Sequence, residues 1–134
     1  LLQNIQKELG TAYIFISHDL TSVAKISHRI AIMYLGHIVE HAPTDIIMRS
    51  QRHPYSRALL SAVLFPDPKR APDPYVIEGE IPTAINPKPE CPPYGRCPIR
   101  EDACKTEVPP MVEVEPDHFS ACRRWREVAA GTEV

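Results

Sequence analysis

The chain has 134 residues and a formal net charge of −2, which results from 15 Lys and Arg residues against 17 Asp and Glu residues. The length predicts one domain, or one domain with an appendage. The balanced charge removes the usual electrostatic basis for binding nucleic acid, which is a basic excess. The longest apolar runs are about six residues, far below the about 20 needed to span a bilayer, and no charged-then-apolar leader precedes the first predicted helix.

Proline and cysteine are concentrated in the second half of the chain. Thirteen of the 15 prolines lie between Pro66 and Pro116, and all four cysteines lie between Cys91 and Cys122. The first 65 residues contain no cysteine and have the apolar patterns of an ordinary α/β protein. A proline-rich segment with few apolar residues cannot offset its ordering entropy by burial alone, so the second region is expected to need a cross-link.

In chain order, residues 1–9 have helical apolar spacing, and Gly10 is a helix-end signal. Residues 12–17 (AYIFIS) form a short apolar run without alternation, which predicts a strand buried on both faces of a parallel sheet. Asp19 is expected to cap the helix that follows. Residues 29–34 and 37–40 are expected to form an antiparallel hairpin with its turn at Gly36.

Further along, Thr44 is expected to cap a short helix, and Pro54 is expected to begin an amphipathic helix that continues to Leu64. Residues 67–74 (DPKRAPDP) are expected to form an exposed connector, and residues 76–81 a short strand. Residues 84–116 show no sustained period, and residues 128–134 are expected to be a frayed end.

His18 lies where the predicted strand over residues 12–17 ends. In open parallel sheets, ligands bind outside the carboxyl ends of the strands, so the His18 ring could contact a phosphate group or a reacting water. From position alone, His18 could also be a polar residue that caps the next helix, and both interpretations stay open at this point.

Residues 13–20 (YIFISHDL) resemble the switch-histidine segment of ATP-binding-cassette (ABC) ATPases. Residues 29–40 (RIAIMYLGHIVE) and 42–44 (APT) are similar to the strand, hairpin and turn that follow it in that family. The resemblance implies that His18 is a catalytic residue that contacts the γ-phosphate of ATP and orients the attacking water, with Mg²⁺ as a further cofactor of the intact subunit. It identifies residues 1–50 as the C-terminal portion of a P-loop ATPase core of α/β class.

Three motifs of the same family are missing from the sequence. They are the GxxxxGK[ST] phosphate loop, the SGG signature loop, and an apolar strand ending in Asp-Glu that holds Mg²⁺. Phosphoryl transfer depends on positioning and on charge stabilisation by that loop and the metal, and His18 alone supplies neither. The chain therefore resembles only the carboxyl-terminal part of an ATPase subunit, and by itself it is predicted to be inactive in ATP hydrolysis.

Residues 53–55 (HPY) and 57–60 (RALL) are similar to the segment that opens the C-terminal extension of the oligopeptide, dipeptide and nickel subgroup of ABC importers. The connector that begins at residues 65–69 (FPDPK) resembles the same subgroup. From composition alone, this helix is expected to cover the preceding domain. The resemblance implies that residues 51–134 form the extension, which is otherwise mostly irregular.

The four cysteines, Cys91, Cys97, Cys104 and Cys122, admit three interpretations. Two disulfides would suit a secreted chain, four free thiols would have no role, and a metal site would have the S₄ ligand set of zinc or an iron–sulfur cluster. Structural zinc sites usually contain closely spaced Cys-x₂₋₄-Cys pairs, and none is present. The wider spacing suits a cluster, with Zn²⁺ as the alternative.

Residues 91–98 (CPPYGRCP), 107–111 (EVPPM) and 113–122 (EVEPDHFSAC) look like the terminal segment of oligopeptide and dipeptide importer ATPases. Members with all four cysteines carry a 4Fe-4S cluster there, and the resemblance implies the same for these four residues. Its expected role is to staple the extension, with redox or iron sensing as the alternative. One departure from the family pattern is Asp117, which replaces a glycine.

The sequence thus predicts the C-terminal part of the ATP-binding subunit of a peptide ABC importer, which couples ATP hydrolysis to peptide uptake. The partners that this family implies are a second ATPase subunit, identical or paralogous, two transmembrane permeases and, indirectly, a solute-binding protein, with no nucleic acid. The expected location is the cytoplasmic face of the plasma membrane, peripheral to it. The alternative hypothesis is a stand-alone cytosolic Cys₄ metal-binding or interaction module without ATPase activity.

Overall fold

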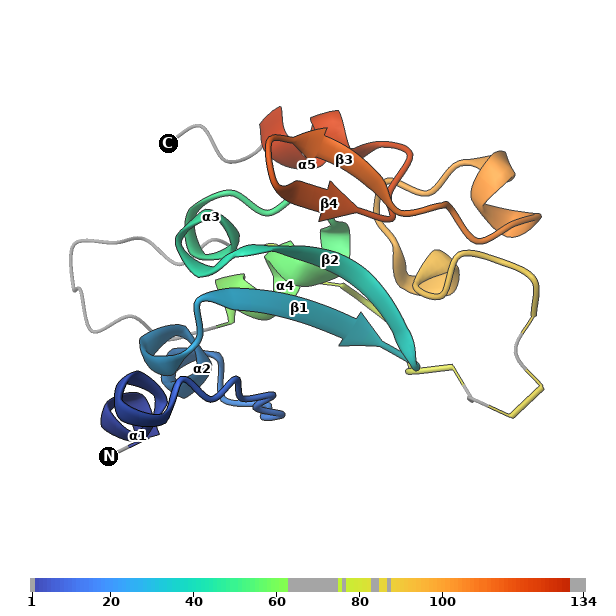
Figure 1. The fold of residues 1–134 in the computed structure, drawn as a ribbon. Coiled ribbons are helices and arrows are strands. Elements are labelled where there is room, and N and C mark those ends of the chain that lie inside the picture. Colours follow the sequence, from blue (N-terminus) through green and yellow to red (C-terminus); the bar gives the residue numbers. More distant parts are fainter. Residues whose placement is uncertain (1, 63–74, 76, 83–84, 87, 131–134) are drawn as a thin grey trace.

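The structure is a computed structural model that describes residues 2–62, 75, 77–82, 85–86 and 88–130 (Figure 1). The described residues form five α-helices, two short 3₁₀ helices and four strands. In chain order these are α1 (Leu2–Leu9), α2 (Leu20–Ile26), β1 (Arg29–Tyr34), β2 (His37–Pro43), α3 (Thr44–Arg49), α4 (Pro54–Ser61), η1 (Tyr94–Arg96), η2 (Asp102–Lys105), β3 (Val112–Glu115), β4 (His118–Ser120) and α5 (Trp125–Ala130).

The four strands make one antiparallel sheet in the order β1-β2-β4-β3. The predicted hairpin is confirmed, with Ile32 of β1 opposite Glu40 of β2. Its turn has φ values of 45° at Leu35 and 82° at Gly36, and two-residue hairpin turns need this left-handed backbone because it matches the twist of the strands. The fold is therefore mixed α/β with an antiparallel sheet.

The apolar core lies between the β1–β2 hairpin and helices α2, α3 and α4 (Figure 1). Burial alternates along β1, so that Ile30, Ile32 and Tyr34 face inward, as expected for a sheet with one covered face. The buried members of this core are Leu20, Val23, Ile30, Ile32, Tyr34, Val39, Ala42, Ile47 and Leu60. Because Leu60 belongs to α4, that helix packs on the hairpin core.

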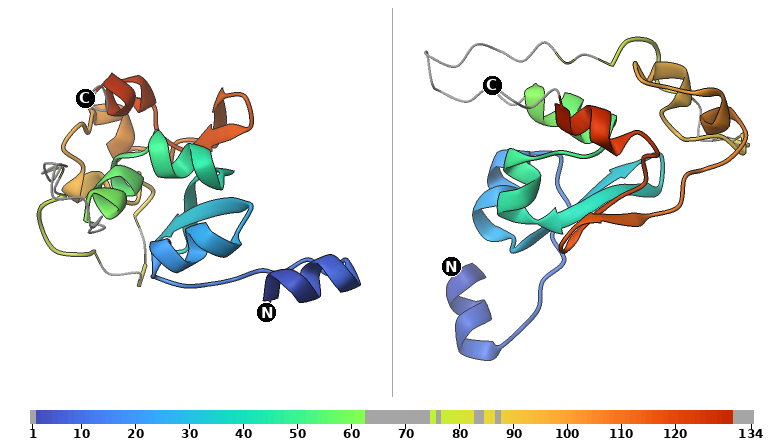
Figure 2. Two further views of the ribbon diagram at one scale, coloured as in Figure 1. Left: turned by 90° about the vertical axis from the view of Figure 1, so that its left-hand side faces the viewer. Right: turned by 90° about the horizontal axis from the view of Figure 1, so that it is seen from above.

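The predicted strand over residues 12–17 is wrong, because these residues form no strand. The side chains of Ile14 and Ile16 are 94% and 93% exposed. A strand needs a neighbouring strand that pairs with its backbone N–H and C=O groups, and none of the four strands in the described part of the chain pairs with this segment. The parallel sheet of the expected fold class is accordingly not observed. Helix α1 lies at the periphery of the described chain and buries no residue (Figure 2). Its Gln3 amide donates to the Lys25 carbonyl of α2 over 3.0 Å.

The β3–β4 hairpin was not predicted. It lies in a region whose sequence has no sustained period, yet β4 pairs with β2 so that Ser120 is opposite Glu40. One sheet therefore contains strands from both sides of residue 50, which is the predicted boundary between core and extension. Between residues 88 and 111, the described chain has only the 3₁₀ helices η1 and η2 as regular structure.

Several local predictions have clear outcomes. Gly10 ends α1 with a φ of 64°, and Pro54 is the first residue of α4, both as predicted. Thr44 is not a helix cap, because its hydroxyl donates to the Ser27 carbonyl over 2.6 Å. Val128 is 1% exposed within α5 and is not part of a frayed end.

Two further predictions fall wholly or partly on residues that are not described. No strand forms over the described residues of the segment 76–81. The predicted connector at residues 67–74 lies outside the described residues. In the part of the chain that the structure describes, no helix is long and apolar enough to cross a bilayer.

Candidate functional site

Three of the four cysteines are positioned by short turns that bond to one another. The Cys91 N–H donates to the Cys104 carbonyl over 2.8 Å, and the Cys91 carbonyl accepts from the Tyr94 N–H over 2.8 Å. Helix η1 then leads into Cys97, while Cys104 lies within η2. These bonds bring two loops, separated by several residues in sequence, against each other.

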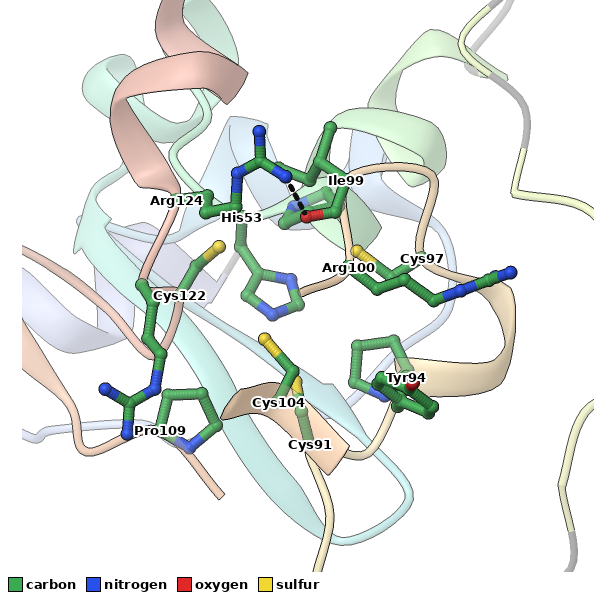
Figure 3. A pocket seen from close by; sticks show the side chains of 13 residues that line it. His53, Cys91, Tyr94, Cys97, Ile99, Arg100, Cys104, Pro109, Cys122 and Arg124 are labelled. Atoms are coloured by element: carbon green, nitrogen blue, oxygen red, sulfur yellow. Dashed lines mark hydrogen bonds between the residues drawn. The ribbon is translucent and has the colours of Figure 1, made fainter. Parts of the chain in front are cut away.

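The fourth cysteine is positioned by the sheet. Cys122 follows β4, and the neighbouring Ala121 N–H donates to the Val39 carbonyl over 2.9 Å. All four cysteines are free and line one hollow, which we call the cysteine hollow (Figure 3). Other residues that line it include His53, Pro54, Tyr94, Arg100 and Arg124. The structure thus brings together the four cysteines that the sequence singled out.

The thiols of the cysteine hollow influence one another. Burial, together with the neighbouring Cys104, Cys122 and Cys97, raises the pKa of the Cys91 thiol to about 12. Burial, followed by the other thiols, also raises the pKa of Cys122 to about 12. For Cys97, burial raises the pKa, while the Ile99 N–H and the charges of Arg100 and Arg124 oppose the rise. Cationic groups at the rim therefore favour the thiolate that a metal requires.

These pKa shifts predict how the metal-free chain responds to alkaline pH. A thiol whose pKa is raised by folding contributes its full stabilisation below the unfolded pKa, near 9.0, and loses it as the pH rises through about 12. The urea midpoint of the chelator-treated chain is therefore expected to fall between pH 8 and pH 10. The double variant C91S/C122S should show a smaller fall, and an unchanged wild-type midpoint would contradict the prediction.

The metal-binding prediction is not confirmed by the geometry. Among the residues that the structure describes, no three His, Cys, Asp or Glu side chains are arranged to hold a metal ion. The donor set itself, four free thiols with arginines at the rim, suits an anionic thiolate centre. Arg124 also donates to the Ile99 carbonyl over 3.0 Å, which ties the start of the C-terminal segment to the loop that carries Cys97.

His18 lies far along the chain from these residues and does not line the cysteine hollow. It is exposed, in a bend between the extended segment and α2. Asp19 caps α2 as predicted, since its carboxylate accepts from the Thr21 and Ser22 N–H groups over 3.0 and 3.3 Å. Hydrogen bonds from the Ser22 hydroxyl and N–H lower the pKa of Asp19. Because Asp19 is the cap, the His18 ring is left available for another contact.

A buried polar cluster was not anticipated from the sequence. Glu40 of β2 and His118 of β4 are both fully buried, and the His118 Nε2 lies 2.7 Å from the Glu40 Oε1. The same Glu40 oxygen accepts from the Arg52 N–H over 2.6 Å. The cluster therefore joins β2, β4 and the segment that leads into α4.

The cluster continues toward the surface through a second carboxylate. Arg52 Nη2 donates to Glu115 Oε1 over 2.6 Å, and this hydrogen bond lowers the pKa of Glu115. Glu115 Oε2 lies 3.5 Å from His118 Nδ1. Ser120 adds a bond from its hydroxyl to the Arg52 carbonyl over 2.9 Å. A signal for this cluster was present at Glu40, a carboxylate that directly follows the apolar pair Ile38-Val39.

Comparison with known proteins identifies the chain. It is 47% identical over 122 residues to a probable peptide ABC transporter ATP-binding protein of Sinorhizobium fredii, an alignment that covers 91% of this chain and 35% of that protein. It is 40% identical over 124 residues to the oligopeptide transport ATP-binding protein of Haemophilus influenzae, covering 91% of this chain and 37% of that protein. Residues 39–104 match the family model "Oligopeptide/dipeptide transporter, C-terminal region". The chain belongs to the oligopeptide/dipeptide transporter family.

The chain spans a little over a third of the length of these curated relatives, 35% and 37% in the two cases. The family match begins at Val39 within β2, includes α3, α4 and the first three cysteines, and ends at Cys104. Cys122 lies beyond that match. It follows β4 and lines the cysteine hollow together with the other three cysteines. The resemblance to oligopeptide/dipeptide transporters stated from the residues is therefore confirmed.

Asp117, which departs from the family pattern, lies at a backbone position that suits glycine. Asp117 has a φ of 61°, a left-handed conformation that glycine adopts without strain and that aspartate tolerates better than most residues. Its N–H donates to the Glu113 carboxylate over 2.9 Å, and its own carboxylate pairs with Arg29. In this member of the oligopeptide/dipeptide transporter family, the tight turn between β3 and β4 is thus held by one local bond to Glu113 and by an ion pair with Arg29 of β1.

Proposed function

We propose that the chain is the C-terminal part of the ATP-binding subunit of a peptide importer, in which ATP hydrolysis drives peptide uptake through two membrane permeases. The observation that carries this proposal is the similarity to peptide-transport ATP-binding proteins over 91% of the chain. In this proposal the subunit pairs with a second ATPase subunit and lies at the cytoplasmic face of the membrane. Residues 1–50 complete the ATPase core and residues 51–134 form its extension.

His18 is proposed to act on ATP bound by the rest of the subunit. Its exposed position before α2 supports this role, because Asp19 already caps the helix. The imidazole would contact the γ-phosphate and orient the attacking water. ATP and Mg²⁺ would be held by motifs that this sequence does not contain, so the role can be expressed only in the intact subunit.

The test of this proposal compares His18 with another exposed histidine. In the intact subunit, His18→Ala is expected to lower ATP hydrolysis about 10²-fold or more, the usual effect of losing a group that positions or deprotonates a nucleophile, while nucleotide binding is retained. His28→Ala, at an exposed position just before β1, should leave hydrolysis unchanged. The 134-residue chain alone should show no turnover. Wild-type hydrolysis in the His18 variant, or measurable turnover by the chain alone, would contradict the proposal.

The four cysteines are proposed to hold a 4Fe-4S cluster rather than a single Zn²⁺. A tetrahedral Zn²⁺ with Zn–S bonds of about 2.3 Å needs sulfurs about 3.8 Å from one another. A cubane spreads its four ligands over four irons, which places the cysteine sulfurs further apart. Four thiols that line one hollow without converging on a single ion position support the larger group. Such a cluster supplies a thiolate cross-link and one-electron redox chemistry.

The cluster assignment is tested by composition and colour. After anaerobic purification, the chain is expected to be brown and to contain iron and acid-labile sulfide in comparable amounts, about four of each per chain. Quantitative iron, sulfide and zinc analysis with a visible spectrum decides the matter. A colourless protein that contains one zinc per chain would overturn the assignment.

A further inference from the structure

His53 is a buried histidine that the proposed function leaves without a role. It is 1% exposed and is the N-cap residue of α4, where its Nδ1 accepts from the Tyr55 N–H over 3.2 Å. A neutral imidazole that accepts at one nitrogen carries its proton on the other. The capping bond therefore fixes the tautomer and makes His53 Nε2 a hydrogen-bond donor.

The ring of His53 is directed into the cysteine hollow. It lines that hollow together with all four cysteines (Figure 3). It also lines an adjoining hollow, bounded by His37, Val39, Pro92 and Met111. Within the described part of the chain, no side chain or carbonyl accepts a hydrogen bond from His53 Nε2. Because His53 lines the hollow together with the cysteines, its Nε2–H can bond to a group that the hollow holds.

The sulfur atoms of the cysteine hollow are the acceptors that the surroundings offer. The side chain of Pro54, which also lines it, has no hydrogen-bond acceptor. Arg100 and Arg124 bring only donors, and Arg124 is already bonded to the Ile99 carbonyl. Thiolate and sulfide sulfurs are negatively charged when they bind iron, and they accept N–H hydrogen bonds.

We propose that His53 is a positioning residue whose Nε2–H donates a hydrogen bond to a sulfur of the Cys-ligated cluster and thereby raises the reduction potential of that cluster. This inference rests on the cluster proposed above. A donated hydrogen bond stabilises the reduced cluster more than the oxidised one, because reduction adds negative charge to the sulfurs. Its place at the N-cap of α4 also couples the cluster to the helix that packs on the hairpin core.

The test uses two variants that share only the loss of the ring donor. His53→Ser keeps a side chain that can cap α4, whereas His53→Phe keeps the ring volume and loses the cap. Midpoint potentials are measured by anaerobic redox titration of the 134-residue chain. Both variants are expected to lower the reduction equilibrium constant about tenfold, which corresponds to about 59 mV for one electron. His41→Ser, whose ring stacks on Phe119 away from both hollows, should leave the potential unchanged.

The outcomes separate this inference from the cluster assignment. A wild-type chain without iron and sulfide would overturn both, whereas a wild-type cluster with unchanged potentials in both variants would overturn only the role of His53. A shift in His53→Phe alone would assign the effect to helix capping and also overturn it. A second measurement needs no variant: in the reduced wild type labelled with ¹⁵N-histidine, pulsed electron–nuclear double resonance should detect a weakly coupled histidine nitrogen. Absence of that coupling would contradict the hydrogen bond.

Discussion

Replacing Cys104 by serine is expected to remove most of the iron from the chain and to release residues 88–111 from the sheet. This segment has two 3₁₀ helices as its only described regular structure, and much of its internal bonding converges on the cysteines, as in the Cys91–Cys104 backbone bond. Structural metal sites contribute on the order of 10 kcal/mol of folding free energy. Without that contribution, the segment has too little apolar surface to stay ordered.

The measurement is iron content together with hydrogen exchange. In Cys104→Ser, amide protection should collapse over residues 88–111 and remain over the β1–β2 hairpin, whose core does not include the cysteines. Lys105→Ser is the matched control, because Lys105 is the exposed neighbour of Cys104 within the same 3₁₀ helix. A Cys104 variant that retains wild-type iron, or that loses protection equally in the hairpin, would show that the cysteines do not staple the extension.

Local signals predicted those elements whose partners are near in sequence. The Gly10 end of α1, the Asp19 cap and the Pro54 start of α4 each depend on contacts within a few residues, and the β1–β2 hairpin on pairs no further apart than Arg29 and Pro43. The strand predicted over residues 12–17 was wrong because a strand depends on partners that are distant in sequence. Their composition favours a buried strand, but a strand is stabilised by partners that the described chain does not provide, and the isoleucines are left exposed.

The β3–β4 hairpin could have been predicted. Residues 112–115 (VEVE) alternate apolar and charged side chains, and Pro116-Asp117 is a turn signal. The prolines on both sides of this run argued against a strand, because proline is rare in paired strands. Its pairing with β2 could not have been read from the sequence, because Glu40 and His118 are 78 residues apart and no local rule relates them.

The sequence predicted the four cysteines of the candidate site, but it did not predict the other residues that line the cysteine hollow. Four cysteines in a proline-rich segment indicated one centre, and the structure does gather them around one hollow. The part played by His53 at that hollow was not visible, because the sequence places it 38 residues before the first cysteine. Only the packing of the first residues of α4 against the loops that carry the cysteines brings the two together. Long-range packing thus supplied the information that spacing could not.

Removing the Glu40 carboxyl group is expected to destabilise the chain by about 2–6 kcal/mol, because two buried hydrogen bonds lose their acceptor. One Glu40 oxygen accepts from both the Arg52 N–H and His118 Nε2. In Glu40→Leu, both donors stay buried and lose their acceptor, and each orphaned donor costs about 1–3 kcal/mol. Glu40→Gln keeps an acceptor of the same shape at this position, so it should cost less than Glu40→Leu.

The effect is measured by urea unfolding followed by circular dichroism, with equal metal content in all samples. The matched control is Asp117→Asn, which weakens the exposed ion pair between Arg29 and Asp117 and should change the free energy of unfolding by less than about 1 kcal/mol. If the buried pair acts as one unit, adding His118→Leu to Glu40→Leu should cost less than the sum of the single variants. Additive losses, or a Glu40→Leu variant as stable as the control, would show that this cluster does not clamp the extension to β2.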